Sequence, residues 1–345
     1  MIRLAFVGTG WIGLNRMQAL LATGKAEAVA VCDPDAAMAG RACEIAPAAR
    51  LCASLDETLS LQPDGVVIAT PNALHAPQCI AALERGAAVF CQKPLGRTGA
   101  EVEAILAATR AADRLLGVDL SYRHTAAMQA IRGLVECGNL GQLFAADLVF
   151  HNAYGPGSGW FWDPELSGGG CLLDLGVHLV DLALWLFGFP EVADAKATLL
   201  RDGGEQVEHY ASASIELASG ASIRLACSWN LPAGHEAVIR ASFYGSGGGA
   251  EMRNVGGSFY DFTAERFNGR DRETLVSPPD EWGGRAAVDW LQRLANGERF
   301  AGTTTGLLQT ARVLDRHYGR ASPHKGADTA QTCAAQPTSR IVELR

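Results

Sequence analysis

The sequence predicts two domains: an α/β amino-terminal domain with a doubly wound parallel sheet, and an α+β domain built on a large, mainly antiparallel open sheet. In the first third, short apolar runs alternate with segments of helical periodicity, which is typical of βα units. Past Pro190, apolar and polar residues alternate at period two, as in half-buried strands. A chain of 345 residues is long enough for both domains. We place them at residues 1–121 and 122–321, followed by a tail at 322–345.

Composition restricts the partners and the compartment. The net charge of −8 has no compensating basic stripe, which argues against nucleic acid and favours a small molecule or a second copy of the chain as partner. The nine cysteines are odd in number and form no C-x-x-C pair, which is typical of a reduced cytoplasmic protein without a zinc or disulfide framework. The chain enters an apolar strand at once, so we expect no export signal.

A glycine-rich turn, GTGWIG, follows the first apolar run and precedes a segment with apolar residues at helical spacing. Strand, G-x-G-x-x-G turn and helix in this order predict a dinucleotide-binding domain of the Rossmann type. Gly8 permits the tight turn, Gly10 lets the backbone approach a pyrophosphate, and Gly13 allows close packing of helix on strand. The cofactor-binding residues predicted here are Gly8, Gly10, Trp11, Ile12 and Gly13.

Asp33 ends the second apolar run, where a carboxylate accepts the ribose hydroxyls of the adenosine half of the cofactor. Asp35 adds a second negative charge where the 2′-phosphate of NADP would lie, and no arginine stands next to these aspartates. NAD is therefore favoured over NADP.

Two motifs stand beyond the carboxyl ends of predicted parallel strands, where such sheets bind ligands. TPNALH follows the apolar run at 66–70, and CQKPL follows the run at 87–91. Ser54 and Thr98 read as capping boxes that open helices between the strands. At this edge Lys93 can donate to a substrate hydroxyl and to the nicotinamide ribose. On position alone, that role and an exposed surface lysine are equally open.

An apolar stretch from Gly168 to Leu186 is interrupted by Asp174, His178 and Asp181. Positions i, i+4 and i+7 share one face of a helix, so the three ionisable groups form a polar stripe. The stripe faces either water or a site, and periodicity leaves both open. The run is near the minimum length for a membrane span and carries carboxylates at its centre, so we expect no membrane association.

These motifs resemble those of the Gfo/Idh/MocA oxidoreductases, the group of glucose–fructose oxidoreductase and inositol dehydrogenase. GTGWIG, TPNALH, CQKPL and DPELSGGGCLLDLGVHLVDL match in order and spacing over most of the chain. The resemblance implies that Lys93 contacts substrate and nicotinamide ribose, that His178 takes the hydroxyl proton, and that Asp174 binds a neighbouring hydroxyl or orients the site. The remaining residues that it places beside the nicotinamide half of the cofactor are Thr70, Pro71, Asn72, His75 and Gln92.

Gln92 is a departure, because the family has glutamate before the lysine. Glutamine is nearly isosteric and still forms hydrogen bonds, so we expect the turn to survive. The loss of a neighbouring carboxylate should make the ammonium form of Lys93 less favoured.

The second domain begins with a helix predicted between Ser121 and Gly138. Tyr122 and Arg123 stand at the domain junction and are candidate substrate-binding residues, with core packing an equal alternative for Tyr122. A long loop rich in glycine and aromatic residues then supplies Trp160 as a candidate wall of a polyol or sugar pocket, with packing over the apolar stretch at 168–186 an equal alternative.

Strands are predicted at 143–150, 192–200, 207–217, 221–229 and 236–244, and closing helices at 286–294 and 305–318. The alternation leaves one face of this sheet half polar. The resemblance implies that this face pairs with another subunit, which would give a homodimer or homotetramer.

We therefore expect a cytoplasmic NAD-dependent oxidoreductase that oxidises a secondary hydroxyl of a cyclic polyol, sugar or sugar derivative, with Lys93, Asp174 and His178 as catalytic residues. The alternatives are an NAD-dependent glycosidase that oxidises its substrate transiently, and a non-catalytic nucleotide-binding sensor. Metal-dependent hydrolysis lacks a second histidine or a cysteine ligand at suitable spacing, so no metal site is predicted. Asp181 is expected to be a structural partner, and the triple glycine at 168–170 to let the backbone approach the ligand.

Overall fold

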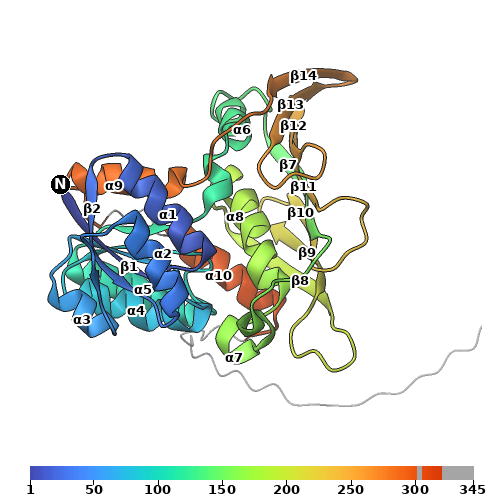
Figure 1. The fold of residues 1–345 in the computed structure, drawn as a ribbon. Coiled ribbons are helices and arrows are strands. Elements are labelled where there is room, and N and C mark those ends of the chain that lie inside the picture. Colours follow the sequence, from blue (N-terminus) through green and yellow to red (C-terminus); the bar gives the residue numbers. More distant parts are fainter. Residues whose placement is uncertain (301–304, 321–345) are drawn as a thin grey trace, which may run out of the picture.

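The first domain is a six-stranded parallel sheet with helices on both faces (Figure 1). The computed structural model describes residues 1–300 and 305–320. The strand order β3-β2-β1-β4-β5-β6 is that of a doubly wound, dinucleotide-binding sheet, so the predicted fold of this domain is confirmed. The strands are β1 (Ile2–Val7), β2 (Ala26–Cys32), β3 (Arg50–Leu51), β4 (Gly65–Ile68), β5 (Ala88–Cys91) and β6 (Leu116–Val118).

The helices of this domain bury apolar faces against the two sides of the sheet. One side is covered by α1 (Trp11–Ala22) and α2 (Ala36–Ile45). The other side is covered by α3 (Leu55–Ser60), α4 (Asn72–Glu84) and α5 (Gly99–Ala112). Ser54 and Thr98 are confirmed as N-caps, because their hydroxyls each accept the backbone N–H three residues further on, at 3.2 Å. The return bonds of the predicted capping boxes are shifted by one residue, since Glu57 and Glu101 accept the N–H groups of Ala53 and Arg97, which precede the caps.

The chain returns to the first domain near its end, through α9 (Arg285–Ala295) and α10 (Thr305–His317). The Trp290 ring of α9 lies 5.6 Å from that of Phe90, between centroids. It fills the space over Gly65 and Gly117, where an added Cβ would lie 2.7 Å from the indole. α10 packs beside α5. The domain division at residue 121 stays a prediction, and the predicted tail at 322–345 lies outside the described residues.

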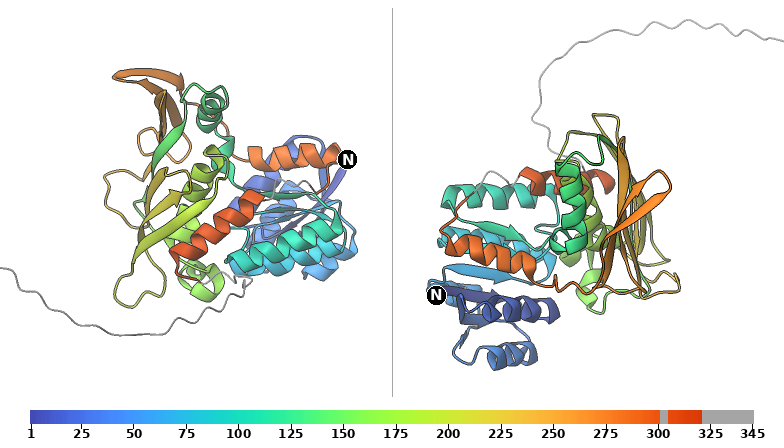
Figure 2. Two further views of the ribbon diagram at one scale, coloured as in Figure 1. Left: turned by 180° about the vertical axis from the view of Figure 1, so that it is seen from behind. Right: turned by 90° about the horizontal axis from the view of Figure 1, so that it is seen from above.

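The second sheet has eight strands in the order β14-β13-β12-β11-β7-β10-β9-β8. Every neighbouring pair is antiparallel except β7 and β10, which confirms the large, mainly antiparallel sheet. Figure 2 shows the hairpin of β13 and β14 extending beyond the rest of the sheet. The strands are β7 (Leu143–Asn152), β8 (Val192–Leu200), β9 (Tyr210–Leu217), β10 (Ser222–Ser228), β11 (Ala237–Gly245), β12 (Gly248–Asn254), β13 (Phe262–Asn268) and β14 (Asp271–Val276).

Three of these strands, β12 to β14, are not among those predicted. Their sequences carry several charged residues, which lower the intrinsic preference for a strand. In the sheet these charges pair across strands, with Glu265 3.6 Å from Arg253 and 3.1 Å from Arg272. The compensating partners come from neighbouring strands and are invisible in a local pattern.

The apolar stretch around Asp174 lies between the two sheets (Figure 1). It comprises α7 (Pro164–Ser167), a π-helical turn (Leu172–Gly176) and α8 (Val177–Leu186), and α8 packs against β7, β10 and α10. By length and composition, Pro164–Leu186 is able to cross a membrane, but 89% of its apolar window is buried inside the fold. The stretch is therefore a core segment of this fold. The remaining short elements are α6 (Ala126–Glu136) and the 3-10 turns Ser121–His124 and Gly159–Trp162.

Candidate active site

The glycine turn between β1 and α1 has no room for a side chain at Gly8 or Gly13, but it is open at Gly10. Gly8 has φ +82°, and an added Cβ would lie 2.6 Å from the Ala69 carbonyl. A Cβ on Gly13 would lie 2.2 Å from the Gly8 oxygen, whereas one on Gly10 would meet nothing within 4 Å. Among the described residues no side chain caps the start of α1, so its first N–H groups are available to an anion. This turn fits the pyrophosphate of a dinucleotide.

The two remaining residues of the turn differ in exposure. Trp11 is exposed at the start of α1, and Ile12 is half-buried. A pocket of about 310 Å³ lies between α1 and α2 and is lined by Trp11, Leu14, Asn15, Gln18, Met38 and Arg41. The predicted contacts of Trp11 and Ile12 with the cofactor stay predictions.

Asp33 lies at the end of β2 and braces the glycine turn. Its Oδ2 accepts the Thr9 N–H at 2.5 Å and the Thr9 hydroxyl at 3.1 Å, and its Oδ1 accepts the Asp35 N–H at 2.9 Å. Because a carboxylate oxygen has two lone pairs, Oδ1 retains one for a ribose hydroxyl. Asp35 itself caps α2 by accepting the Ala37 N–H.

His75 ties together two turns at the carboxyl edge of the first sheet. Its ring is fully buried, with Nδ1 2.7 Å from the Pro94 oxygen and Nε2 2.8 Å from the Thr70 oxygen. Burial lowers the pKa of His75. The ring is therefore placed to hold the two turns in position, and direct contact with a cofactor would require it to move.

Asn72 joins the first domain to the central segment, which is the stretch Pro164–Leu186 that comprises α7, the π-helical turn and α8. Its side-chain amide is buried and donates to the Ser167 oxygen of α7 at 2.8 Å. Pro71 and Thr70 precede it and are half-buried at the sheet edge. Of the predicted cofactor residues in this motif, Thr70 and Pro71 are the ones left accessible to a ligand.

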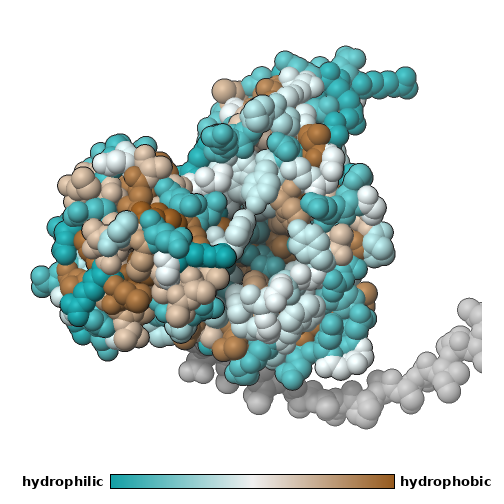
Figure 3. Space-filling view, in the orientation of Figure 1, coloured by the Kyte–Doolittle hydropathy of each residue, from teal (hydrophilic) through white to brown (hydrophobic). Residues whose placement is uncertain are grey.

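Lys93 and Asp174 form an ion pair between the first domain and the central segment. Lys93 Nζ donates to Asp174 Oδ1 at 2.6 Å and to its backbone oxygen at 2.9 Å. Trp229, the last residue of the strand predicted at 221–229, was not among the predicted site residues and donates its Nε1–H to Asp174 Oδ2 at 3.1 Å. An ammonium group has three N–H donors, so one remains for a substrate oxygen. Figure 3 shows that the surface is hollowed between the two halves of the molecule that this pair joins.

His178 follows on the same segment and is only 7% exposed. Burial lowers the pKa of His178 well below its ordinary value, and the cations Lys93 and Arg16 lower it further because they oppose a second positive charge. The Tyr122 ring contacts it edge-on, with 4.8 Å between ring centroids. The lowered pKa favours the neutral form of the His178 imidazole, near the Lys93 ammonium group.

Tyr122 is itself buried, at 7% exposure, and packs against Phe150, Phe262 and Trp282 as well as His178. Burial raises the pKa of Tyr122. These contacts correspond to the core-packing alternative, and its substrate contact stays a prediction.

The π-helical turn carries Asp174 and rotates α8, with both His178 and Asp181, relative to it. One extra residue in a turn rotates the rest of the helix by about 100° relative to an uninterrupted α-helix. Asp181 accordingly pairs with Arg123, whose Nε donates to Asp181 Oδ2 at 2.6 Å and whose Nη2 donates to Oδ1. This agrees with the structural role expected for Asp181. The Arg123 guanidinium, a candidate for substrate binding, is committed to this pair.

The triple glycine makes room for the protein's own side chains and backbone, so the prediction that it admits a ligand is wrong. An added Cβ on Gly169 would lie 2.3 Å from Tyr318 Oη, and one on Gly170 would lie 1.9 Å from the Glu208 backbone oxygen. The Glu208 carboxylate accepts the Gly170 and Leu172 N–H groups at 3.0 Å and the Tyr318 hydroxyl at 2.7 Å. Glu208 is buried here, although the alternation at 207–217 predicted an outward position.

The aromatic loop packs over Trp229. Trp162 lies 5.1 Å and Phe161 6.3 Å from its ring, between centroids, and Trp160 stacks on Phe161 at 3.8 Å. Trp160 is therefore two rings removed from Asp174. Its contact with substrate stays a prediction.

A buried cluster beside the Lys93 turn was missed by the sequence analysis. Arg16 Nε and Gln92 Nε2 donate to the same oxygen, Asp119 Oδ2, at 2.6 and 2.5 Å. Asp119 directly follows β6, as Gln92 follows β5, so its position at a strand end was the available signal.

Two family models match the chain in succession. An oxidoreductase family with an NAD-binding Rossmann fold matches residues 2–120, and the Gfo/Idh/MocA C-terminal domain matches residues 128–251. A putative UDP-kanosamine synthase oxidoreductase subunit of Amycolatopsis mediterranei (strain S699) is 30% identical over 275 residues, covering 73% of this chain and 75% of the relative. The chain belongs to the Gfo/Idh/MocA oxidoreductase family.

Other relatives in this family have names that refer to sugars and polyols. D-glucoside 3-dehydrogenase of Escherichia coli (strain K12) is 28% identical over 269 residues, which are 73% of this chain and 77% of that protein. Inositol 2-dehydrogenase of Corynebacterium glutamicum (strain ATCC 13032) is 26% identical over 311 residues, which are 82% of this chain and 90% of the relative. This Gfo/Idh/MocA chain is therefore an NAD(P)-binding oxidoreductase.

Solved structures support the same fold. Levoglucosan dehydrogenase in complex with NADH and L-sorbose has a TM-score of 0.80 at 20% identity, covering 92% of this chain and 96% of that one. A 3-ketoreductase from Actinomadura kijaniata in complex with NADP and TDP-benzene has a TM-score of 0.81 at 21% identity, covering 92% and 97%. Because one of these complexes holds NADH and the other NADP, the choice of cofactor is not determined by the fold.

At position 92, where this Gfo/Idh/MocA chain has glutamine and the family has glutamate, the side chain has a partner other than Lys93. The Gln92 side chain turns to Asp119, while Lys93 turns to Asp174. Lys93 therefore has a carboxylate partner at 2.6 Å without a glutamate at position 92.

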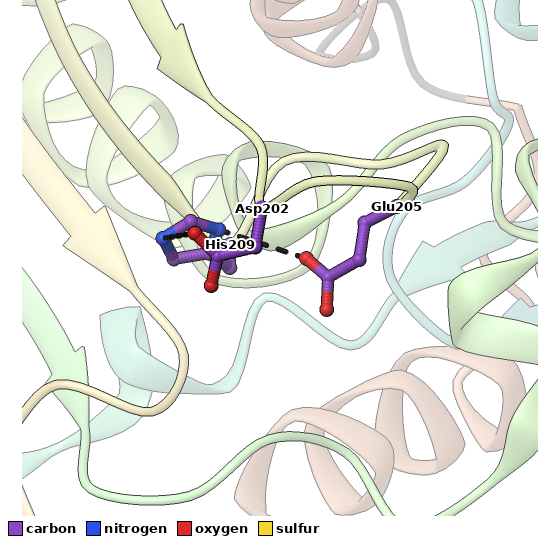
Figure 4. A group of neighbouring side chains, drawn as sticks. All are labelled: Asp202, Glu205 and His209. Atoms are coloured by element: carbon purple, nitrogen blue, oxygen red, sulfur yellow. Dashed lines mark ion pairs between the residues drawn. The ribbon is translucent and has the colours of Figure 1, made fainter.

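One cluster of metal-ligating atoms occurs within the described residues, on the loop between β8 and β9 (Figure 4). His209 Nε2 lies 3.8 Å from Asp202, and His209 Nδ1 lies 3.6 Å from Glu205. One ligand atom from each of the three residues lies within 4.8 Å of the others, and both acidic residues are exposed. Exposed acidic groups are common in such arrangements without an ion, so no metal site is proposed here.

Proposed function

We propose that this enzyme oxidises a secondary hydroxyl of a sugar or cyclic polyol by hydride transfer to NAD. The observation that carries the proposal is the Lys93–Asp174 ion pair beside buried His178, at the sheet edge that also carries the open glycine turn. A proton donor, a neutral base and a dinucleotide site meet there. These are the groups that dehydrogenation of an alcohol requires.

Each of the three residues has a separate role. The third N–H of Lys93 donates to the oxygen of the reacting hydroxyl and favours the developing alkoxide. His178 accepts the hydroxyl proton. Asp174 is engaged through both oxygens, so it orients Lys93 and does not act as a base. The bound nicotinamide supplies the hydride acceptor.

The low pKa of His178 sets the expected pH dependence. A base works in its neutral form, so oxidation should be sustained well below the ordinary titration range of histidine near pH 6.5. Activity should fall only as the pH drops through the lowered pKa of His178.

NAD is proposed as the cofactor because Asp33 and Asp35 place two carboxylates at the end of β2. Arg41 is the nearest candidate to oppose this choice, since it lines the pocket between α1 and α2. Titration of the purified protein with NAD and NADP by intrinsic fluorescence tests the choice. Equal or tighter binding of NADP would overturn it.

The principal experiment is a panel of polyols and sugars with NAD, followed by the absorbance of reduced nicotinamide. His178→Ala should lower kcat by about 100- to 10,000-fold, the usual contribution of a general base, with unchanged NAD affinity. His235→Ala, at an exposed histidine, is the matched control and should keep parental activity. Turnover in His178→Ala equal to that of the parent, or no turnover with any substrate, would contradict the proposal. Cleavage of a glycoside without net NADH would instead identify the glycosidase alternative, and cofactor binding without any turnover would identify the sensor.

We further propose a homodimer or homotetramer formed through the open face of the second sheet, in a cytoplasmic protein. Cross-strand ion pairs such as Arg224–Asp147 make this face polar, which suits pairing with a second copy of the same face. The cysteines within the described residues are free thiols, which supports a reducing compartment. Light scattering on the parent and on Arg224→Glu tests the assembly, since reversing the charge should dissociate it. A monomeric parent would refute the proposed assembly, and recovery of the protein in a periplasmic or membrane fraction would refute the proposed compartment.

A further inference from the structure

Arg16, Gln92 and Asp119 form a buried unit next to the Lys93 turn. They come from α1, from the end of β5 and from the end of β6, and they are 5%, 7% and 1% exposed. Arg16 and Gln92 share one acceptor, Asp119 Oδ2, and within the described residues Asp119 Oδ1 has no partner. This chain therefore buries a carboxylate with one cation and one neutral amide donor.

The charge of this unit restricts position 92. A buried charge requires a partner of opposite sign, and Arg16 supplies it for Asp119. A carboxylate at position 92 would be an acceptor facing another acceptor, 2.5 Å from Asp119 Oδ2. Two carboxylates at that distance cannot both ionise. The amide of Gln92 avoids this conflict because it donates.

We propose that Arg16, Gln92 and Asp119 act as one charge-balanced positioning unit for Lys93 and His178, in which Asp119 supplies the single negative charge and position 92 must be a neutral donor. Gln92 immediately precedes Lys93, so its bond to Asp119 fixes the direction in which the Lys93 turn leaves β5. Asp119 also neutralises Arg16, one of the two cations that act on His178.

The groups that face His178 and Asp119 come from several elements. His178 is faced by Lys93 from the turn after β5, by Arg16 from α1, and by the Tyr122 ring from the 3-10 turn at Ser121–His124. Asp119 is faced by Arg16 and Gln92, and it lies near the titratable groups of His124 and Cys91.

A double-mutant cycle tests the unit independently of activity. Gln92→Glu and Asp119→Asn should each lower the melting temperature, the first by opposing two carboxylates and the second by leaving Arg16 unpaired. The double variant moves the single negative charge from position 119 to position 92 and should recover most of the parental melting temperature. Gln292→Glu, the same substitution at an exposed position of α9, is the control and should change little. Additive losses in the double variant, or a neutral Gln92→Glu, would overturn the proposal.

The positioning role rests on the proposed function and is read from the pH profile of kcat/KM. Asp119→Asn removes a negative charge and should move the acid limb, set by His178, to lower pH by about one unit. Gln92→Glu should leave it close to the parental position, because the two carboxylates retain one proton between them and the unit gains no net charge, and the double variant should return it to the parental position. Coupled stability with an unchanged acid limb would make the unit purely structural and refute the positioning role. If the parent oxidises no substrate, the proposed function fails, whereas the stability cycle still decides whether the charges are coupled.

Discussion

Asp174 shows how a single side chain joins the two halves of the site. One carboxylate oxygen accepts from Lys93 of the first domain, and the other accepts from Trp229 at the end of β10. Both donors fix the plane of the carboxylate, and the ammonium of Lys93 is aimed by the same contact. These two contacts support the orienting role proposed for Asp174, and they make its indole partner Trp229 a candidate positioning residue.

Trp229→Phe should lower kcat/KM by about 10- to 100-fold. It removes one hydrogen bond to a carboxylate, which is worth about 1.5–3 kcal/mol, while an aromatic ring remains against Trp162. Steady-state kinetics with the best sugar or polyol measure the effect. Asp174→Asn is the reference, and the double variant should be no slower than Asp174→Asn alone. Multiplicative losses would show that Trp229 acts elsewhere.

At the scale of elements, the π-helical turn and its anchor set the direction of the catalytic face. Glu208 accepts N–H groups from Gly170 and Leu172, so a buried carboxylate fixes the start of the turn that carries Asp174. The turn then rotates α8, which leaves His178 near Lys93 and sends Asp181 to Arg123. An uninterrupted α-helix would have kept Asp174 and Asp181 on one face.

Gly170→Ala should destabilise the protein by about 3 kcal/mol or more and impair the site. The added Cβ would lie 1.9 Å from the Glu208 backbone oxygen, and this oxygen, which accepts the Cys171 N–H at 2.9 Å, cannot move aside as a side chain can. Urea unfolding measures the loss. Gly159→Ala, in the preceding loop with nothing within 4 Å of its Cβ, is the control and should stay within about 0.5 kcal/mol of the parent. Equal stability of the two variants would contradict this account of the triple glycine.

At the scale of the whole molecule, buried histidines make stability depend on pH. His75, His178 and His317 all have a pKa lowered mainly by burial, and that of His317 falls to about 4. Above about pH 6.5 these rings are neutral in both the folded and the unfolded chain and contribute nothing. Below it the unfolded chain binds protons that the folded chain does not, so the free energy of unfolding falls as the pH falls.

His317→Gln should flatten this dependence between about pH 6.5 and 4. Removing the titration of His317 eliminates a loss that reaches about 3 kcal/mol at pH 4, from 2.5 units at 1.36 kcal/mol each. Urea unfolding at several pH values gives the two curves. His235→Gln, at an exposed histidine, serves as control and should run parallel to the parent. A His317→Gln curve that also ran parallel to the parent would refute the assignment.

Much of the first domain could be predicted because its signals are local. A glycine turn between a strand and a helix, a capping box such as Thr98-x-x-Glu101, and the place of Lys93 after an apolar run depend on near neighbours in the chain. The same holds for the alternation of β9 and β10 in the second sheet. Local pattern failed where charged strands β12 to β14 find their partners only in the sheet.

The sequence by itself determined the nucleotide-binding fold, the family motifs and the identity of Lys93, Asp174 and His178 as candidates, because backbone conformation and helical periodicity follow from adjacent residues. Only the tertiary structure decided which partner each polar group takes. Asp174 is 81 residues from Lys93, and Arg16 is 103 residues from Asp119. Burial makes unpaired polar groups unfavourable, so such partners are selected by three-dimensional proximity, which no local pattern records.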